Sequence, residues 1–404
     1  MSNEKYAKLI MVTSANNNKY YEMTWSGGSN FTVKYGRVES TVQTASYPIS
    51  MWSTKYNEKI RKGYKDVTEF VTVEVTKVAK DNTPLEDVKE KLVNEFLTLM
   101  KAYTDKLVST TYSVKAEAVS QKQVDAAQKI IDDLNKLVSS QTKAGMIANQ
   151  PKINELLVEL YTVIPRRMGH VGDYILPNID IDKTLFKEQD NLDAMASQVS
   201  LIKPKTAKQA KAEKKTSQTI LDKLGITMAE AKVYKEIDYL LKQSHGRKVR
   251  AIFEVNKPAE DAQFNGWVSK QKDKSTKILI HGTRCTSVIP ILEIGLKIRP
   301  TGGNFQFSGK AYGDGNYFSE HMQKSLGYTG GDSDKVILVY EVHTGNPFTY
   351  DGWYRGNSFT LNYTELQKRG FDSTFVKAGN GLLNSEIIAY NEQQNRIKYI
   401  IWLK

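Results

Sequence analysis

Three short segments near the C-terminal end of the chain each place a polar side chain next to a predicted β-strand. His281 follows the apolar run 277–280, Tyr317 follows two glycines that favour a turn, and Glu386 opens the strand-like sequence Glu-Ile-Ile-Ala-Tyr. Taken singly, a His at a strand end is more often a structural residue than a functional one. A His, a Tyr and a Glu on separate strands together predict a cleft formed where strand ends meet.

Length and composition favour several domains in one intracellular chain. With 404 residues, we expect two or three domains, each with its own core. No apolar run is long enough to cross a membrane and the N-terminus has no apolar signal core. We therefore expect the nucleus in a eukaryote, and otherwise the cytoplasm or nucleoid. The single cysteine, Cys285, excludes a disulfide framework and a Cys-based zinc module, and no metal site is predicted.

Residues 1–80 are predicted to form a small, mainly β domain. Segments 20–25 and 30–35 have the composition of strands, and the Gly-Gly-Ser sequence at 27–29 favours a turn between them. One face of a following helix is indicated by residues four positions apart: Trp52, Tyr56 and Ile60. Lys and Arg outnumber Asp and Glu in this segment. Together with the chain's net charge of +12, this excess favours a polyanionic partner.

Residues 84–203 are predicted to form an all-α bundle. Apolar residues recur every three or four positions from Leu85 to Leu107, and a second helix is predicted from Ser120, with Gln123 completing a capping box. Two further helices are predicted to start near Pro151 and to cover about 182–201. Residues 204–215, rich in lysine and without apolar periodicity, are predicted to be a basic linker.

Residues 216–404 are predicted to form an α+β domain that contains the three polar segments. No Gly-x-Gly-x-x-Gly sequence follows a strand at a helix start, which gives no support to a Rossmann dehydrogenase. The combination of His281, Tyr317 and Glu386 instead resembles the His-Tyr-Glu signature of the poly(ADP-ribose) polymerase catalytic domain. The Lys-Ser-x-x-Tyr sequence at 324–328 is similar to a second motif of that family. This resemblance implies split antiparallel sheets that hold NAD.

The resemblance also implies a role for each site residue. His281 would hold the adenine ribose, Gly282 and Ser325 the nicotinamide amide, and Tyr317 and Tyr328 would flank the nicotinamide ring. Glu386 would bind the nicotinamide ribose, stabilise positive charge at C1′ and activate the acceptor hydroxyl. His281, Tyr317 and Glu386 would form the catalytic set. Further NAD contacts are implied for Thr283, Ser287 and Lys297. NAD would be a substrate, so no cofactor is predicted.

The first two predicted domains also resemble parts of this family. The Tyr35-Gly36-Arg37 sequence is similar to the motif of WGR domains, with Tyr35 in place of the family's Trp. Tyr35 and Arg37 would therefore contact DNA ends. The helices, above all residues 161–165, resemble the helical regulatory domain that restrains the NAD cleft in DNA-dependent members, and Asp190-Asn191-Leu192 resembles its cleft-facing helix.

A few positions depart from the family pattern. Asp314 stands where Lys is common, Lys297 where Arg often reaches the adenosine, and Ser319 where a small residue is usual. Asn384 and Ala311 replace larger residues on the acceptor side of polymerising members. The expected activity is therefore ADP-ribose transfer, with product length left open.

Two interpretations remain on the sequence alone. The first is a multi-domain α+β ADP-ribosyltransferase that DNA breaks activate and that modifies itself and other proteins during DNA repair. The second is a non-catalytic scaffold that binds DNA and NAD. Because a degenerate member would be expected to lose the triad first, Glu386 favours the enzyme.

Overall fold

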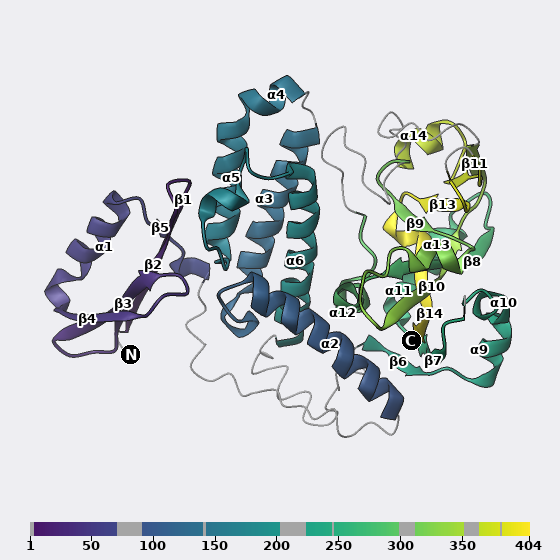
Figure 1. Cartoon of the computed structure of the whole chain (residues 1–404), viewed down its shortest axis with the longest axis horizontal. Helices are drawn as coiled ribbons and strands as arrows, with labels where there is room; N and C mark the ends of the chain where they lie inside the picture. Colours follow the sequence, from purple (N-terminus) through teal and green to yellow (C-terminus); the bar gives the residue numbers. More distant parts are fainter. Residues whose placement is uncertain are drawn as a thin grey trace. The chain divides into compact units, whose positions relative to one another are not determined.

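The computed structural model describes residues 4–70, 91–139, 143–202, 224–244, 246–298, 312–350, 363–379 and 382–404. The chain divides into two compact units (Figure 1). The first unit holds residues 1–81 and 105–204, and the second holds residues 82–104 and 205–404. The predicted linker 204–215 and the predicted boundaries near residues 80 and 216 lie outside the described residues, so they stay predictions.

The first unit begins with a five-stranded antiparallel sheet in the order β4-β3-β2-β1-β5. Its strands are β1 (Lys5–Thr13), β2 (Asn17–Trp25), β3 (Asn30–Arg37), β4 (Gln43–Pro48) and β5 (Lys65–Asp66). Alternate apolar residues of three strands point to one face and pack under α1 (Trp52–Arg61), as period-two patterning requires. The predicted strands, turn and helix are all present, with Gly27 and Gly28 at positive φ in the turn.

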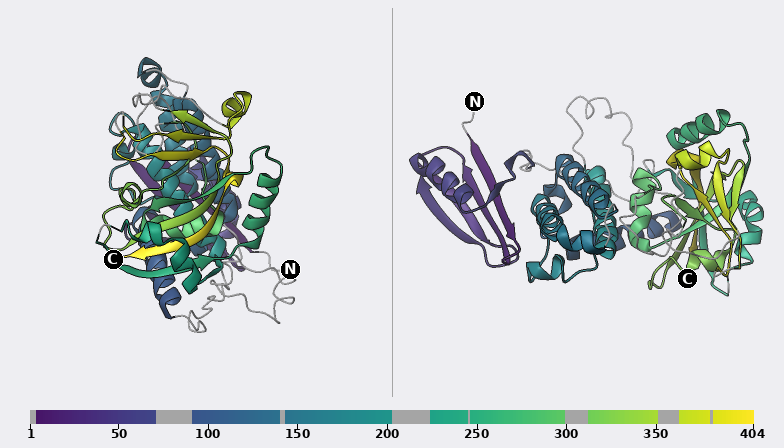
Figure 2. Two further views of the ribbon diagram at one scale, coloured as in Figure 1. Left: turned by 90° about the vertical axis from the view of Figure 1, so that its right-hand side faces the viewer. Right: turned by 90° about the horizontal axis from the view of Figure 1, so that it is seen from above.

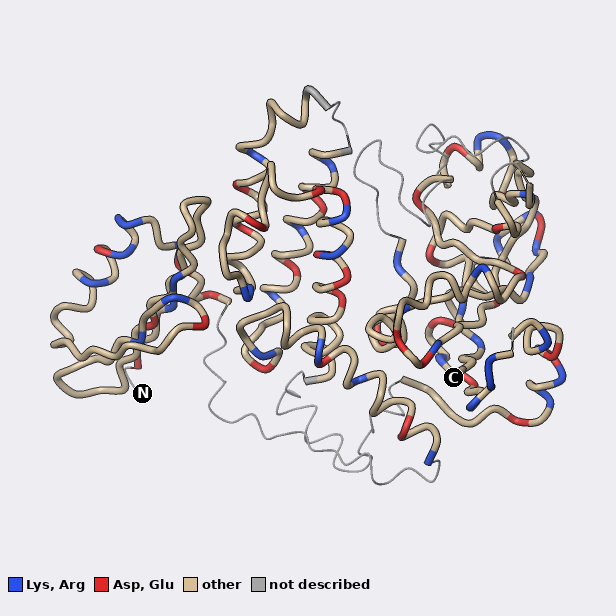
Figure 3. Tube along the Cα trace, in the orientation of Figure 1, with Lys and Arg blue, Asp and Glu red and all other residues tan. Residues whose placement is uncertain are grey.

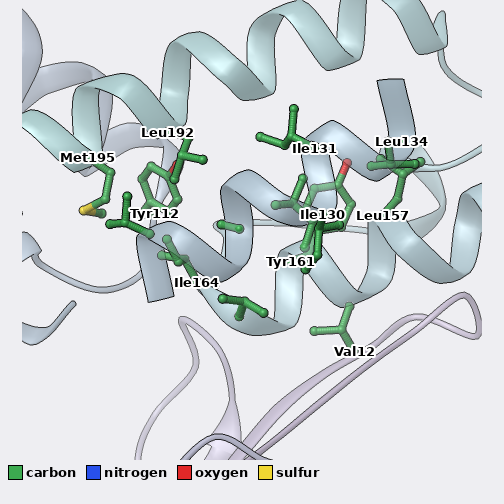
Figure 4. Close-up of a cluster of buried hydrophobic side chains, with 14 of the residues drawn as sticks. Val12, Tyr112, Ile130, Ile131, Leu134, Leu157, Tyr161, Ile164, Leu192 and Met195 are labelled. Atoms are coloured by element: carbon green, nitrogen blue, oxygen red, sulfur yellow. The ribbon is translucent and has the colours of Figure 1, made fainter. Parts of the chain in front are cut away.

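The same unit contains a group of helices. They are α3 (Gln121–Ser139), α4 (Lys143–Ala148), α5 (Gln150–Val163) and α6 (Ile181–Ile202). The capping box predicted before α3 is confirmed, because Ser120 N donates to Gln123 Oε1 at 3.0 Å and Gln123 N donates to Ser120 Oγ at 3.3 Å. Buried side chains of these helices form one core with Val12 from β1 (Figure 4).

Helix α2 (Lys91–Thr111) contributes residues to both units, because the division falls between Thr104 and Asp105. In the second unit its Phe96 ring lies 4.7 Å from Phe253 and 5.5 Å from Trp402, centroid to centroid. The face it buries is only partly the one that the apolar stripe suggested. Phe96 is buried, whereas Leu92 and Leu99 are half-exposed and the neighbours Val93, Leu97 and Met100 are buried instead. Helix α2 packs against the aromatic side chains of a sheet, Phe253 and Trp402, and this contact decides which face of the helix is buried.

The rest of the second unit is an α+β domain with two sheets (Figure 2). The strand orders are β6-β7-β14-β10-β8 in one sheet and β11-β12-β13-β9 in the other. The strands are β6 (Ile226–Met228), β7 (Val249–Val255), β8 (Thr276–Thr283), β9 (Asn316–Phe318), β10 (Lys335–His343), β11 (Pro347–Tyr350), β12 (Ser373–Val376), β13 (Glu386–Ala389) and β14 (Asn395–Leu403). The helices are α9 (Ala231–Glu236), α10 (Asp238–Leu241), α11 (Pro258–Ser269), α12 (Cys285–Ile294), α13 (Met322–Leu326) and α14 (Tyr363–Lys368).

The predicted α+β architecture, with an N-terminal antiparallel sheet, a helical region and an α+β C-terminal part, is confirmed. The expectation of purely antiparallel sheets is wrong at one pair, because β11 and β12 run parallel. The chain between these two strands includes α14, and a parallel pair needs such a crossover connection rather than a hairpin.

Candidate active site

The three predicted catalytic residues come from strands that meet where the two sheets part. At this point Ile280 of β8 and Ser319, just after β9, form an isolated antiparallel bridge. Ile280 N donates to Ser319 O at 2.9 Å, and Ser319 N donates to Ile280 O at 3.0 Å. His281 follows Ile280, and Tyr317 lies two residues before Ser319. The seam between the sheets therefore brings two segments together that are far apart in the sequence.

His281 is fixed by a hydrogen bond to the neighbouring strand. Its Nδ1 lies 2.9 Å from the carbonyl oxygen of Tyr317. A carbonyl oxygen only accepts, so Nδ1 carries the proton. Burial lowers the pKa of His281, and this hydrogen bond opposes the shift in part. Because the net shift is downward, the ring is neutral at pH 7. In a neutral ring with a protonated Nδ1, Nε2 is an acceptor suited to a ribose hydroxyl.

Gly282 has a steric reason to be glycine. A Cβ at this position would lie 1.7 Å from the carbonyl oxygen of Ser325, a backbone atom of α13. No side chain fits there unless the backbone moves. Ser325 is buried, and its hydroxyl donates to Ile280 O at 3.4 Å. Gly282 and Ser325 are therefore adjacent, and their shared role in holding an amide stays a prediction.

Tyr317 is held by its hydroxyl. The oxygen accepts a hydrogen bond from Tyr312 N at 2.8 Å and donates one to Gly313 O at 2.8 Å. Burial, with the charge of Glu386 among lesser causes, raises its pKa far above the ordinary value, so the phenol stays protonated. The pairing of Tyr317 with Ile388 places it on the strand next to the one that Glu386 opens.

Glu386 is the first residue of β13 and is 5% exposed. Its Oε1 lies 2.9 Å from Nζ of Lys324 on α13, so the buried carboxylate forms an ion pair with a half-buried ammonium. Sequence reasoning assigned no role to Lys324, although it is the first residue of the Lys-Ser-x-x-Tyr motif. The signal was therefore present, but only the fold shows that Lys324 and Glu386 pair.

The other predicted NAD contacts differ in how accessible they are. Thr283, at the end of β8, is buried, whereas Ser287 on α12 and Tyr328 after α13 are half-buried. Lys297 pairs with Glu392 at 2.8 Å, which ties the ammonium to this unit. Ala311 lies outside the described residues. Asn384 lies two residues before Glu386 and is half-exposed.

The two predicted DNA contacts lie on β3 of the first unit, away from the residues above in the sequence. Tyr35 packs with Tyr21, with ring centroids 6.0 Å apart. The Arg37 guanidinium donates to Asn16 O at 2.7 Å and to Gly169 O at 2.9 Å. Arg37 therefore already links the N-terminal sheet to the chain after α5 within this unit.

Within the described residues, no group of three or more His, Cys, Asp or Glu side chains is arranged to hold a metal ion. In that same part of the chain, every helix is too short or too polar to cross a bilayer.

A glycine that contacts α13, a neutral histidine, a half-buried tyrosine and an ion-paired glutamate meet at the seam between the sheets, which is the arrangement expected of a nucleotide-binding transferase domain. Residues 231–352 match the family model of the poly(ADP-ribose) polymerase catalytic domain. The chain is 56% identical over 168 residues to putative poly [ADP-ribose] polymerase-like 100L of Invertebrate iridescent virus 6, which covers 41% of this chain and 92% of that protein. It is 47% identical over 196 residues to uncharacterized protein 101L of the same virus, which covers 48% of this chain and 78% of that protein.

A more distant relative covers more of the chain. Poly [ADP-ribose] polymerase 1 of Gallus gallus is 23% identical over 395 residues, which covers 89% of this chain and 36% of that protein. The chain belongs to the poly(ADP-ribose) polymerase family and is an NAD⁺ ADP-ribosyltransferase. The prediction of an NAD⁺ ADP-ribosyltransferase is therefore confirmed, whereas activation by DNA breaks stays a prediction.

Proposed function

We propose that this enzyme is activated by DNA strand breaks and transfers ADP-ribose from NAD to itself and to other proteins, with release of nicotinamide. The observation that carries the transfer step is the ion pair of the buried Glu386 with Lys324, beside the seam that positions His281 and Tyr317. A carboxylate at such a place can oppose the positive charge that develops when a glycosidic bond breaks.

In this proposal, each site residue contacts a different part of NAD. His281 Nε2 accepts a hydrogen bond from the adenine ribose, and Gly282 with Ser325 binds the nicotinamide amide. Tyr317 and Tyr328 flank the nicotinamide ring, and Thr283, Ser287 and Lys297 add contacts. Because both hydroxyl bonds of Tyr317 go to the preceding turn, its ring has a fixed orientation, which supports a stacking role.

Glu386 acts at the reacting carbon. It hydrogen-bonds the nicotinamide ribose, stabilises the oxocarbenium-like centre at C1′ and accepts the proton of the attacking hydroxyl. Lys324 holds the carboxylate in place through the 2.9 Å contact. The acceptor side carries Asn384 and Ala311 where polymerising members have larger residues, which favours short products.

DNA activation is the second part of the proposal. The N-terminal sheet carries the Tyr35-Gly36-Arg37 motif, and Lys and Arg are distributed over this sheet and α1 (Figure 3). DNA ends bind through these groups, and the helices restrain the catalytic domain until DNA favours a loosened state. The bond of Arg37 to Gly169, which follows α5, supports a physical link between the sheet that binds DNA in this proposal and the helical region.

Incubation of the full chain with labelled NAD, with and without nicked DNA, tests both parts, with sizing of the modified product. The expected result is transfer that increases when nicked DNA is added. Transfer that is equally strong without DNA would contradict activation and leave the transfer chemistry standing. No transfer under either condition, from a folded protein that binds NAD, would contradict the whole proposal.

A further inference from the structure

Ser319 lies where the strands of all three site residues converge. It comes directly after β9, one residue from the ladder that joins β9 to β13. That ladder ends at the pair Ile387–Phe318, so the next pair in an antiparallel register would be Glu386 with Ser319. This pair does not form, because the backbone of Ser319 turns instead to Ile280 of β8. The two sheets part at this residue.

The side chain of Ser319 replaces the backbone pairing that is lost. Its hydroxyl donates to the carbonyl oxygen of Ser385 at 3.1 Å and accepts from the amide of His321 at 3.1 Å. Ser385 is the residue immediately before Glu386. Ser319 is 2% exposed and Ser385 is 7% exposed, so water has little access to these bonds. The Ser319 backbone thus belongs to one sheet, and its side chain is bonded to the other.

We infer that Ser319 is a positioning residue for Glu386, because its hydroxyl fixes the start of β13 to the seam between the sheets. The inference rests on the proposed role of Glu386. His281 does not depend on the same bond, because the backbone bridge between Ile280 and Ser319 holds β8, and alanine or cysteine at 319 keeps both backbone groups of that bridge.

This separation predicts a specific kinetic effect. Ser319→Ala removes the hydroxyl and leaves the buried carbonyl of Ser385 without its donor, while the backbone bridge stays. Glu386 then moves relative to C1′, and small displacements of a reacting group have large effects on rate. We expect kcat to fall roughly tenfold, which corresponds to about 1.4 kcal/mol. The KM for NAD should stay nearly constant, since the His281 contact is unchanged.

Ser373→Ala is the matched control. Ser373 lies on β12 of the same sheet, is fully buried, and its hydroxyl donates to Thr344 O at 2.6 Å. Its removal deletes a comparable buried bond that does not lead to Glu386. Both variants are compared in the full chain by thermal unfolding and by NAD kinetics, together with Ser319→Cys, whose thiol is a weaker donor.

The inference predicts similar losses of thermal stability in the two alanine variants, a fall in kcat only for Ser319→Ala, and an intermediate kcat for Ser319→Cys. Equal kcat values in the two alanine variants would overturn the inference, because the hydroxyl of Ser319 would then contribute only to stability. A rise in KM that matches the fall in kcat would also overturn it. Glu386→Gln in the same assay keeps the proposals distinct, because normal turnover there contradicts the role of Glu386 itself.

Discussion

Two buried carboxylates, one in each compact unit, have opposite surroundings. Glu386 in the catalytic unit is 5% exposed and lies 2.9 Å from the ammonium of Lys324. Asp182, in the first turn of α6, is 3% exposed, and neither of its oxygens has a hydrogen-bond partner among the described residues. Burial, with the charge of Asp180 as a lesser cause, raises the pKa of Asp182 to about 7.

The difference bears on stability. A buried carboxylate beside a cation is held in one position, whereas one without a partner destabilises the fold when it ionises. In the catalytic unit, the contact with Lys324 therefore holds the carboxylate of Glu386 in place. The helical region contains a group that destabilises it near neutral pH, which fits the proposal that this region restrains the catalytic domain and loosens when DNA binds. The predictions below test this contrast.

Replacing the paired carboxylate should have the largest effect. Glu386→Gln keeps the shape but loses the charge that opposes the oxocarbenium centre and the capacity to take a proton. We expect turnover to fall about 100-fold, roughly 2.7 kcal/mol of transition-state stabilisation, with NAD binding kept. If the wild-type enzyme makes a polymer, the product of Glu386→Gln should shorten to single ADP-ribose units before all transfer is lost. Glu341→Gln is the control, because it breaks an ion pair with Arg396 elsewhere in the unit. Near-normal turnover of Glu386→Gln with unchanged product length would refute the assignment.

Removing the helical region should raise activity without DNA. Replacing residues 105–203 by a flexible linker keeps the first part of α2 and should increase DNA-independent transfer roughly tenfold. Deleting residues 84–203 also removes Phe96 from between Phe253 and Trp402, and Glu95 from its ion pair with Arg250. The longer deletion should therefore melt at a lower temperature. Unchanged DNA-independent activity in a folded 105–203 deletion would argue against a restraint.

The unpartnered carboxylate predicts a pH dependence of the first unit. The pKa of Asp182 is about 7 in the fold and about 3.9 when unfolded, so the folded state binds the proton more tightly. Stability should therefore fall as pH rises between these values, by about 1.4 kcal/mol per pH unit, and level off above pH 7. Asp182→Asn should abolish this slope in hydrogen exchange of α6. Asp133→Asn, on the exposed face of α3, should leave it unchanged. The same slope in both variants would exclude Asp182 as its source.

The smallest effect is expected at the DNA contact. Arg37→Ala in the full chain should weaken binding to nicked DNA several-fold and reduce the slope of log affinity against log salt by about one. Fluorescence anisotropy at several salt concentrations measures both quantities. Lys183→Ala, in the helical region, should change neither. If Arg37→Ala leaves the slope unchanged, Arg37 acts only through its bonds to Asn16 and Gly169.

Much of the local structure was predictable because it depends on neighbouring residues. The strands 20–25 and 30–35, the glycine turn between them and the capping box at Ser120 all follow from short-range patterns, and all are present. The stripe on α2 was less accurate. Periodicity shows that a helix has an apolar face, but Leu92 and Leu99 are half-exposed, because the partner surface selects which residues it buries.

The sequence by itself determined the residue types of the site and their order along the chain. His281, Tyr317 and Glu386 stand beside strands, and the family resemblance that they carry is confirmed by the relatives. The tertiary structure alone decided that Lys324 faces Glu386, that Ser319 joins the two sheets, and that Asp182 is buried without a partner. The sequence around a charged or hydroxyl side chain looks the same whether or not that side chain has a partner in the fold. Its partners come from distant segments, and only the packing of those segments sets their distances.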